Sequence, residues 1–280
     1  MDFISRLIDL SARPVPLRTL IIRRLLTRWP IGPYRARLNA GAVDRPAYGF
    51  CMFHAAEQAK ALGFKAISAI EMGVAGGNGL LCMCRHRDEI KKALGIDIHL
   101  YGFDSGAGLP SSDDPRDVLY YWAPGSYAMD RPALEKRLAG RANLVFGDVA
   151  DTAAKWQAPP NAPLGAILFD LDFYSSTAAA FKLLDCNNAL PRVWCYFDDV
   201  TGGPSHALTD YMGEREAIRQ FNLAPGRSLR RDSISRAYAF ATKPPESWHD
   251  RIYLYHRQSH PAYNTFVAVK DEQQLPLNSD

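Results

Sequence analysis

The sequence predicts one α/β domain with a mainly parallel sheet and a helical extension at its N-terminus. Short apolar segments alternate with longer segments of helical period, a pattern typical of parallel strands buried on both faces. A chain of 280 residues with 47% hydrophobic residues is long and apolar enough to form one core. The first 45 residues differ from the rest in charge, because they carry nine arginines against three aspartates.

We therefore divide the chain into a basic extension, 1–45, and a domain, 46–280. In the extension, apolar side chains recur at four-residue steps, the period of a helix, at Leu17, Ile21, Leu25 and Trp29. Arginines fall on all sides of this helix, whereas a membrane-surface helix needs a segregated basic face. Packing against the domain or against a second copy of the chain, in a homodimer, is therefore favoured over contact with a membrane.

The domain is expected to begin with a helix over 48–62, closed by Gly63. Seven apolar segments are the predicted strands, at 67–75, 99–104, 144–148, 166–172, 193–199, 236–240 and 264–269. Helices are expected between them, near 80–94, 150–157, 175–189 and 208–222. Since no clear helix separates the last two strands, the sequence predicts an antiparallel pair at the end of the chain.

Composition and charge argue against several classes of protein. A net charge of +3 gives no general electrostatic footprint for nucleic acid. No apolar segment has the length of a membrane span, and the first residues do not read as a signal peptide. Five cysteines without a CxxC pair fit free, buried thiols in a reducing cytosol, so we expect a cytoplasmic protein.

A glycine-rich loop follows the first predicted strand of the domain. It has the spacing E-x-G-x-x-x-G-x-G, formed by Glu71, Gly73, Gly77 and Gly79. Glycine permits a tight turn and a close approach of the backbone to a ligand. The spacing matches neither the dinucleotide fingerprint nor a P-loop. A carboxylate inside the loop would repel a pyrophosphate but suits a cationic ligand, such as S-adenosylmethionine.

Further carboxylates stand where predicted strands end. Asp104 closes the second strand, where an acidic side chain accepts hydrogen bonds from ribose hydroxyls. Asp148 follows the third strand and could reach a base or cap the next helix. Four more aspartates end the next two strands, at Asp170, Asp172, Asp198 and Asp199. Such a group suits Mg²⁺ or Ca²⁺, and a hard cation could acidify a substrate hydroxyl. Alternatively, Asp172 caps the following helix.

Four motifs in this order resemble the macrocin O-methyltransferase family of class I S-adenosylmethionine-dependent enzymes. They are EMGVAGGNG at 71–79, YGFDSGAGLP at 101–110, FDLDFYSST at 169–177 and FDD at 197–199. The resemblance covers about 48–241 and implies a Rossmann-like, seven-stranded sheet with a reversed last strand. It also implies Mg²⁺-dependent methylation of a hydroxyl on a small acceptor, often a sugar of a natural product.

The resemblance also assigns residues. It implies that the glycine loop holds the methionine part of the cofactor, Asp104 and Ser105 the ribose, and Asp148 the adenine region. The cofactor set is then Glu71, Gly73, Gly77, Gly79, Asp104, Ser105, Asp148 and Asp170. The implied metal ligands are Asp170, Asp172, Asp198 and Asp199. The sequence departs from the family at Gly106-Ala107, where an acidic residue is usual, and at Val200, where an aromatic one is.

O-methylation requires a group that takes the proton of the acceptor. Asp172 is the first choice for this base, and His206 is the second. The aromatic residues of 118–134 could form a lid over an acceptor ring or simply pack on the domain. For Glu214, Glu216 and Arg219, solvated salt bridges are a sufficient explanation.

Two other functions remain open at this point. A nicotinamide-dependent oxidoreductase would share the α/β architecture, although the glycine spacing and Glu71 disfavour it. A non-catalytic cofactor-binding protein could use the same scaffold and meet its partners through the basic extension. Methylation of nucleic acid is the weakest alternative, because the positive charge is confined to the N-terminus.

Overall fold

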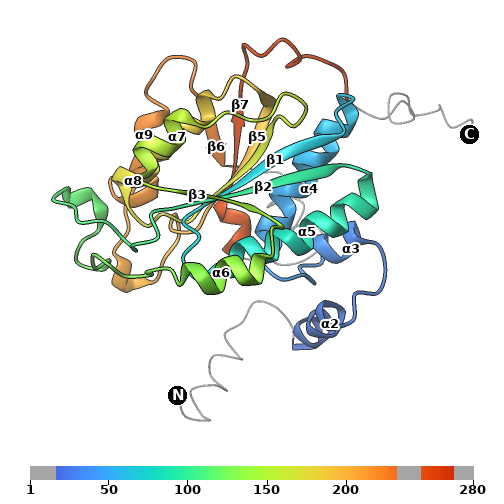
Figure 1. Cartoon of the computed structure of the whole chain (residues 1–280), viewed down its shortest axis with the longest axis horizontal. Helices are drawn as coiled ribbons and strands as arrows, with labels where there is room; N and C mark the ends of the chain where they lie inside the picture. The colour runs from blue at the N-terminus through green and yellow to red at the C-terminus, as the bar shows by residue number, and fades with distance from the viewer. Residues whose placement is uncertain (1–16, 232–246, 268–280) are drawn as a thin grey trace, which may run out of the picture.

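The computed structural model describes residues 17–231 and 247–267. A seven-stranded sheet of order β3-β2-β1-β4-β5-β7-β6 forms its centre (Figure 1). The strands are β1 (Ala66–Met72), β2 (Asp97–Asp104), β3 (Asn143–Phe146), β4 (Leu164–Phe169), β5 (Ala189–Phe197), β6 (Leu229–Arg231) and β7 (Ile252–His256). The pairings are parallel except those of β7, which runs antiparallel to β5 and β6. The predicted sheet with a reversed last strand is therefore confirmed.

Helices cover both faces of this sheet. The helices are α2 (Leu17–Arg28), α3 (Tyr34–Asn39), α4 (Pro46–Ala61), α5 (Asn78–Leu94), α6 (Arg131–Leu138), α7 (Val149–Lys155), α8 (Tyr174–Ala180) and α9 (Gly213–Phe221). α4 and α5 pack on one face, and α7, α8 and α9 enclose the core on the other (Figure 1). Burial on both faces explains why the parallel strands read as continuous apolar segments.

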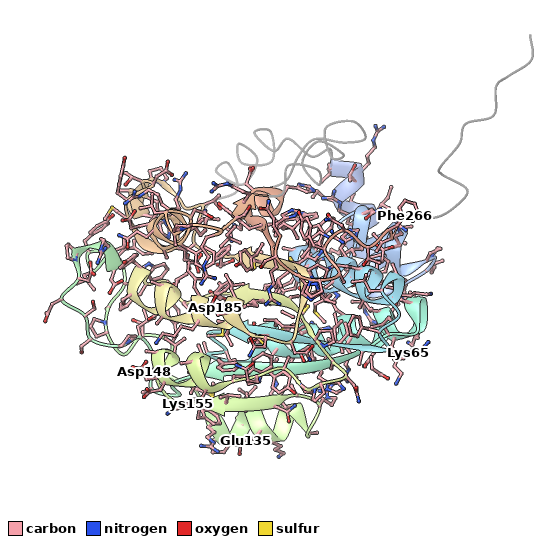
Figure 2. The ribbon with its side chains drawn as sticks, turned by 90° about the horizontal axis from the view of Figure 1, so that it is seen from above. Lys65, Glu135, Asp148, Lys155, Asp185 and Phe266 are labelled. Atoms are coloured by element: carbon pink, nitrogen blue, oxygen red, sulfur yellow. The ribbon has the colours of Figure 1, made fainter. Side chains whose placement is uncertain are left out.

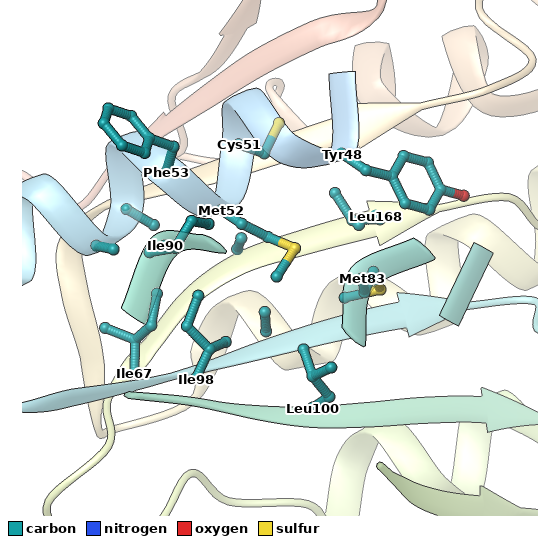
Figure 3. Close-up of a cluster of buried hydrophobic side chains, with 14 of the residues drawn as sticks. Tyr48, Cys51, Met52, Phe53, Ile67, Met83, Ile90, Ile98, Leu100 and Leu168 are labelled. Carbon is teal, nitrogen blue, oxygen red and sulfur yellow. The ribbon is translucent and has the colours of Figure 1, made fainter. Parts of the chain in front are cut away.

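The core beneath α4 fixes that helix against the central strands. Cys51, Met52 and Phe53 of α4 are buried over Ile67 of β1 and Leu168 of β4 (Figure 3). Each large side chain in such a position contributes about 1.5–3 kcal/mol of transfer free energy. At the other end of the helix, Tyr48 lies toward the carboxyl ends of the strands (Figure 3). Packing of α4 thus places one side chain at the rim of the sheet.

Aromatic packing on the opposite face orders the ends of β4 and β5. The rings of Phe169 and Phe197 stack with centroids 4.6 Å apart and an interplanar angle of 2°. Phe181 meets both rings edge-on, at 5.5 and 6.0 Å. Offset and edge-to-face ring pairs add about 0.5–1.5 kcal/mol each beyond area burial. The residues that follow Phe169 and Phe197 are therefore held at fixed positions.

The surface and the thiols agree with the composition. Glu135 of α6 and Lys155 of α7 point away from the sheet (Figure 2). All five cysteines are buried and free, as predicted. Within 17–231 and 247–267, the search for a helix with the length and hydropathy of a membrane span found none.

Three details of the predicted elements are wrong. The end of the chain supplies its antiparallel pair from β6 and β7, whereas 264–267 forms a turn and irregular backbone. The strand predicted at 236–240 lies outside the described residues. α6 was not expected, and the helix predicted at 175–189 ends at Ala180 and continues as a 3₁₀ turn. Short elements such as β6 and α6 carry too little periodicity to be recognised.

The basic extension divides into two parts. α2 forms as predicted, but none of its residues is buried. α3 packs on α4 and α5, with Tyr34 and Leu38 in the core. The Tyr34 hydroxyl lies 2.9 Å from Nδ1 of His86, and Arg37 pairs with Glu89. Packing on the domain thus holds for α3 and not for α2.

Candidate functional site

A cleft of about 660 Å³ opens at the carboxyl ends of the strands. Its ionisable lining consists of one cation and seven carboxyl groups, namely Arg45, Glu71, Asp104, Asp148, Asp170, Asp172, Asp198 and Asp199. All of the predicted cofactor residues and all of the predicted metal ligands line it. Of the predicted site residues, His206 is the exception. The rim of an α/β sheet is the usual ligand-binding position in such folds.

Backbone hydrogen bonds at the strand ends bring the carboxylates together. The N–H of Asp170 donates to the carbonyl of Met72 at 2.9 Å, which joins the ends of β4 and β1. The N–H of Asp198 donates to the carbonyl of Phe169 at 3.1 Å, which joins β5 to β4. Three neighbouring strands therefore end at one level. The acidic residues that follow them face one cleft.

Two glycines of the loop are required by close contacts. Gly73 has φ +84°, and a Cβ there would lie 1.8 Å from the carbonyl oxygen of Asp170. A Cβ on Gly79 would lie 1.7 Å from Oε1 of Glu71. Real Cβ atoms do not approach other atoms this closely, so a larger residue would displace the backbone or the carboxylate. The glycine spacing thus shapes the pocket around Glu71.

Glu71 is buried at the floor of the cleft with part of its carboxylate unpaired. The Tyr48 hydroxyl donates a hydrogen bond to Oε1 at 3.2 Å. Oε2 is buried and has no partner among the described residues. Burial and the nearby Asp170 carboxylate raise the pKa of Glu71 to about 8. A buried, half-satisfied carboxyl group of this kind favours a cationic hydrogen-bond donor.

Arg45 supplies the positive charge of the cleft. Its Nη1 donates to the Tyr48 hydroxyl at 3.3 Å, so one hydroxyl separates the guanidinium from the Glu71 carboxylate. Arg45 has a left-handed backbone, φ 42° and ψ 65°, and is the N-cap of α4. Such backbone strain persists where surrounding structure fixes it, often at ligand sites. Sequence analysis missed Arg45 and Tyr48, because nothing in their local pattern points to the glycine loop.

Asp104 fastens the glycine loop. Its Oδ2 accepts the N–H groups of Val74 and Ala75, both at 2.8 Å, and its Oδ1 accepts that of Gly106 at 2.6 Å. Three backbone donors already satisfy most of its acceptor capacity. Asp104 therefore shapes the cleft directly, and its predicted contact with a ribose stays a prediction.

Two other predicted cofactor residues also make local hydrogen bonds. The Ser105 hydroxyl donates to the carbonyl of Gly108 at 3.1 Å and stabilises the turn after β2. Asp148 is the N-cap of α7 and accepts the N–H of Ala150 at 2.7 Å. Both residues also line the cleft, so these structural roles and a ligand contact are compatible.

Three of the aspartates form a compact acidic cluster. Carboxylate oxygens of Asp170, Asp198 and Asp199 lie within 4.8 Å of one another. Burial and the neighbouring carboxylates raise the pKa of Asp170 to about 7. Oδ2 of Asp199 is buried without a partner in the described part of the chain. Asp198 is more exposed and accepts a hydrogen bond from Nη1 of Arg251 at 2.6 Å. Hard oxygen donors of this kind suit Mg²⁺.

Asp172 lies beside this cluster and does not cap the next helix. Its φ of +61° turns the chain after β4, and a hydrogen bond joins its carboxyl group to that of Asp199. Burial raises the pKa of both groups. The start of α8 is held instead by Asp117, which accepts the N–H and hydroxyl of Ser175 at 2.8 and 2.7 Å. Asp172 is therefore available for proton transfer.

Glu214 belongs beneath the site, contrary to the expectation of a solvated salt bridge. Its side chain is fully buried, and its Oε2 accepts the N–H of Asp199 at 2.8 Å. Glu216 is also buried but pairs with Arg219 at 2.6 Å, so an ion pair is present there. The chain folds α9 under the end of β5, and no local sequence signal distinguishes Glu214 from its neighbours.

The aromatic segment between β2 and α6 forms one side of the cleft. Trp122 and Tyr127 line it, whereas the Tyr121 ring packs on His206 with centroids 3.8 Å apart. The Tyr120 hydroxyl donates to the carbonyl of His206 at 2.8 Å. His206 is thus held behind the aromatic wall. This position disfavours its predicted role as a base.

No family model matches the sequence, and no curated protein matches it. Among solved structures, the calicheamicin methyltransferase CalS11 is similar over 90% of this chain and 90% of its own, with 19% identity and a TM-score of 0.47. An O-methyltransferase from Bacillus cereus in complex with SAH is similar over 84% and 97%, with 14% identity and a TM-score of 0.38. Likenesses this distant do not identify an activity, which has to be inferred from the residues of the cleft.

Proposed function

We propose that the protein is an S-adenosylmethionine-dependent O-methyltransferase, assisted by Mg²⁺, that acts on a small polar acceptor. The observation that carries this proposal is the pairing of Arg45 with Glu71 across the Tyr48 hydroxyl. The amino-acid end of S-adenosylmethionine bears one carboxylate and one ammonium. Arg45 suits the carboxylate, and the unpaired oxygen of Glu71 suits the ammonium.

The charge of the cleft supports this choice of ligand. Seven carboxyl groups and one guanidinium would repel the pyrophosphate of a nicotinamide dinucleotide. S-adenosylmethionine has a cationic sulfonium and ammonium, and its single anionic group can lie against Arg45. A cleft of about 660 Å³ is within the usual range for sites that bury a small ligand.

The acidic cluster fits a divalent cation. Asp170, Asp198 and Asp199 converge, and the orphaned Oδ2 of Asp199 is a donor atom without a present use. When bound, Mg²⁺ would act as a Lewis acid that lowers the pKa of an acceptor hydroxyl. The N–H bond from Asp199 to Glu214 fixes the backbone of this ligand. Asp198 is held in place by Arg251.

Asp172 is the residue that we assign to take the acceptor proton. It lines the cleft, shares a hydrogen bond with Asp199 and has a raised pKa, which makes its carboxylate a stronger base than an ordinary aspartate. Trp122 and Tyr127 offer ring faces to an acceptor beside these carboxylates. Such faces suit a sugar or another ring of a natural product.

Calorimetric titration tests the proposal. Micromolar binding of S-adenosylmethionine and S-adenosylhomocysteine is expected, together with a Mg²⁺ site that Asp199→Asn removes. The matched control is Asp210→Asn, an exposed aspartate outside the cleft lining. Transfer of a labelled methyl group to a panel of glycosides then tests the acceptor class. Failure of both adenosyl ligands to bind would exclude the function.

A further inference from the structure

α2 and the turn after it present a surface that the fold does not use. Figure 1 shows α2 at the periphery, away from the sheet. Large apolar side chains between 48% and 74% exposed lie here, at Leu17, Ile21, Ile22, Leu25, Trp29 and Ile31. We call these six residues, with Arg18, Arg24 and Arg28, the α2 surface. Contiguous apolar exposure on this scale marks an interaction site.

The charge of this region is uniformly positive. Residues 10–43 contain seven arginines and no aspartate or glutamate. The arginines of the α2 surface are exposed, and none forms a salt bridge with a described residue. The guanidinium of Arg28 lies 5.9 Å from the centre of the Trp29 ring. A partner must therefore offer negative charge together with an apolar layer.

Arginines and apolar residues share the exposed side of α2. At 100° per residue, Leu17, Ile21 and Leu25 fall on one stripe, and Arg24 and Arg28 flank it. Long arginine side chains can reach to the level of phosphates while neighbouring apolar groups lie deeper. The arrangement therefore meets the requirement that, in sequence, the scattered arginines had made doubtful.

The helix has a fixed attachment to the domain. α3 follows the turn and is anchored by the contact of Tyr34 with His86 and by the Arg37–Glu89 pair. The apolar side chains of α2 contribute nothing to the core. Their retention at the surface is therefore not explained by folding.

We propose that the α2 surface binds an anionic lipid surface, with the apolar stripe and Trp29 at the headgroup boundary and the arginines on lipid phosphates. A second copy of the chain fits less well. Symmetric contact would bring two sets of arginines together, and residues 10–43 offer no carboxylate to neutralise them. The proposal does not depend on the function of the cleft.

Co-sedimentation of the full chain with vesicles tests this. Binding to vesicles of phosphatidylcholine with phosphatidylglycerol is expected, with little binding to phosphatidylcholine alone. Arg18→Gln, Arg24→Gln and Arg28→Gln together should weaken binding by about 100-fold, because each arginine near an anionic surface contributes about fivefold. Leu25→Asp should weaken it by at least about tenfold, because a buried leucine is lost.

Leu223→Asp is the matched control, since Leu223 is 70% exposed and lies outside the α2 surface. Thermal unfolding of each variant checks that the fold is unchanged. Equal binding to neutral and anionic vesicles, or equal effects of Leu25→Asp and Leu223→Asp, would overturn the proposal. Absence of vesicle binding with a doubled solution mass that Leu25→Asp halves would assign the surface to a second copy instead.

Discussion

Replacing Arg45 with methionine separates recognition of the amino-acid end from recognition of the nucleoside. The substitution keeps an unbranched side chain of similar reach but removes the cation that faces seven carboxyl groups. A hydrogen bond to a charged group contributes about 1.5–3 kcal/mol. Affinity for S-adenosylhomocysteine should therefore fall by roughly 10- to 100-fold. Because Arg45 is partly exposed, the lower end of this range is expected.

The assay is calorimetric titration with two ligands. 5′-Methylthioadenosine has the same nucleoside and thioether but lacks the carboxylate and the ammonium, so its affinity should change by less than about twofold. Arg45→Lys should recover part of the affinity for S-adenosylhomocysteine, because it retains the charge but not the planar fork. Arg131→Met is the control, since Arg131 is exposed and pairs only with Glu135 along α6.

Two results have different meanings. If wild-type protein binds S-adenosylhomocysteine and Arg45→Met binds it equally well, the assignment of Arg45 to the carboxylate is refuted while the cofactor is retained. If the wild-type protein binds neither ligand, the cofactor itself is wrong. Selective loss of S-adenosylhomocysteine in the variant supports both.

Three further predictions concern the loop, the core and a remote cap. Gly79→Ala should lower affinity for S-adenosylhomocysteine by at least about tenfold in the same titration, because its methyl group displaces the Glu71 carboxylate; Gly203→Ala, which meets no atom closer than 3.9 Å, should not. Burial lowers the pKa of His86 from 6.5 to about 4, so on acidification the unfolded chain is protonated first. The free energy of unfolding should therefore fall by about 3 kcal/mol between pH 7 and pH 4 in excess of His86→Gln, as measured by urea titration; parallel curves for the two proteins would contradict this. Asp117→Ala should cost about 2 kcal/mol of stability, since it leaves the N–H of Ser175 and two hydroxyls unpaired. Asp113→Ala, at an exposed position, should change the denaturation midpoint little, and an equal loss would exclude the cap.

Local rules explain what could be predicted in advance. Parallel strands buried on both faces are continuous apolar segments, so the central five were recognised from hydropathy alone. The glycine loop announces itself by spacing, and the carboxylates announce themselves by following strands. Because parallel strands end at one edge, the convergence of Glu71, Asp170 and Asp198 follows from the fold class. These features depend on neighbours in sequence and on one topological rule.

The remaining features depend on which distant residues the chain brings together. Arg45 reaches Glu71 through Tyr48 only because α4 packs across β1 and β4. Glu214 reads as a surface charge until α9 folds beneath Asp199.

The sequence by itself determined the architecture and the cluster of carboxylates. The tertiary structure decided that Asp172 is free of the helix it precedes and that His206 lies behind an aromatic wall. It also decided that α2 keeps its apolar side chains exposed. The physical reason is that burial and partner choice are set by contacts between residues far apart in the chain, which hydropathy and spacing do not encode.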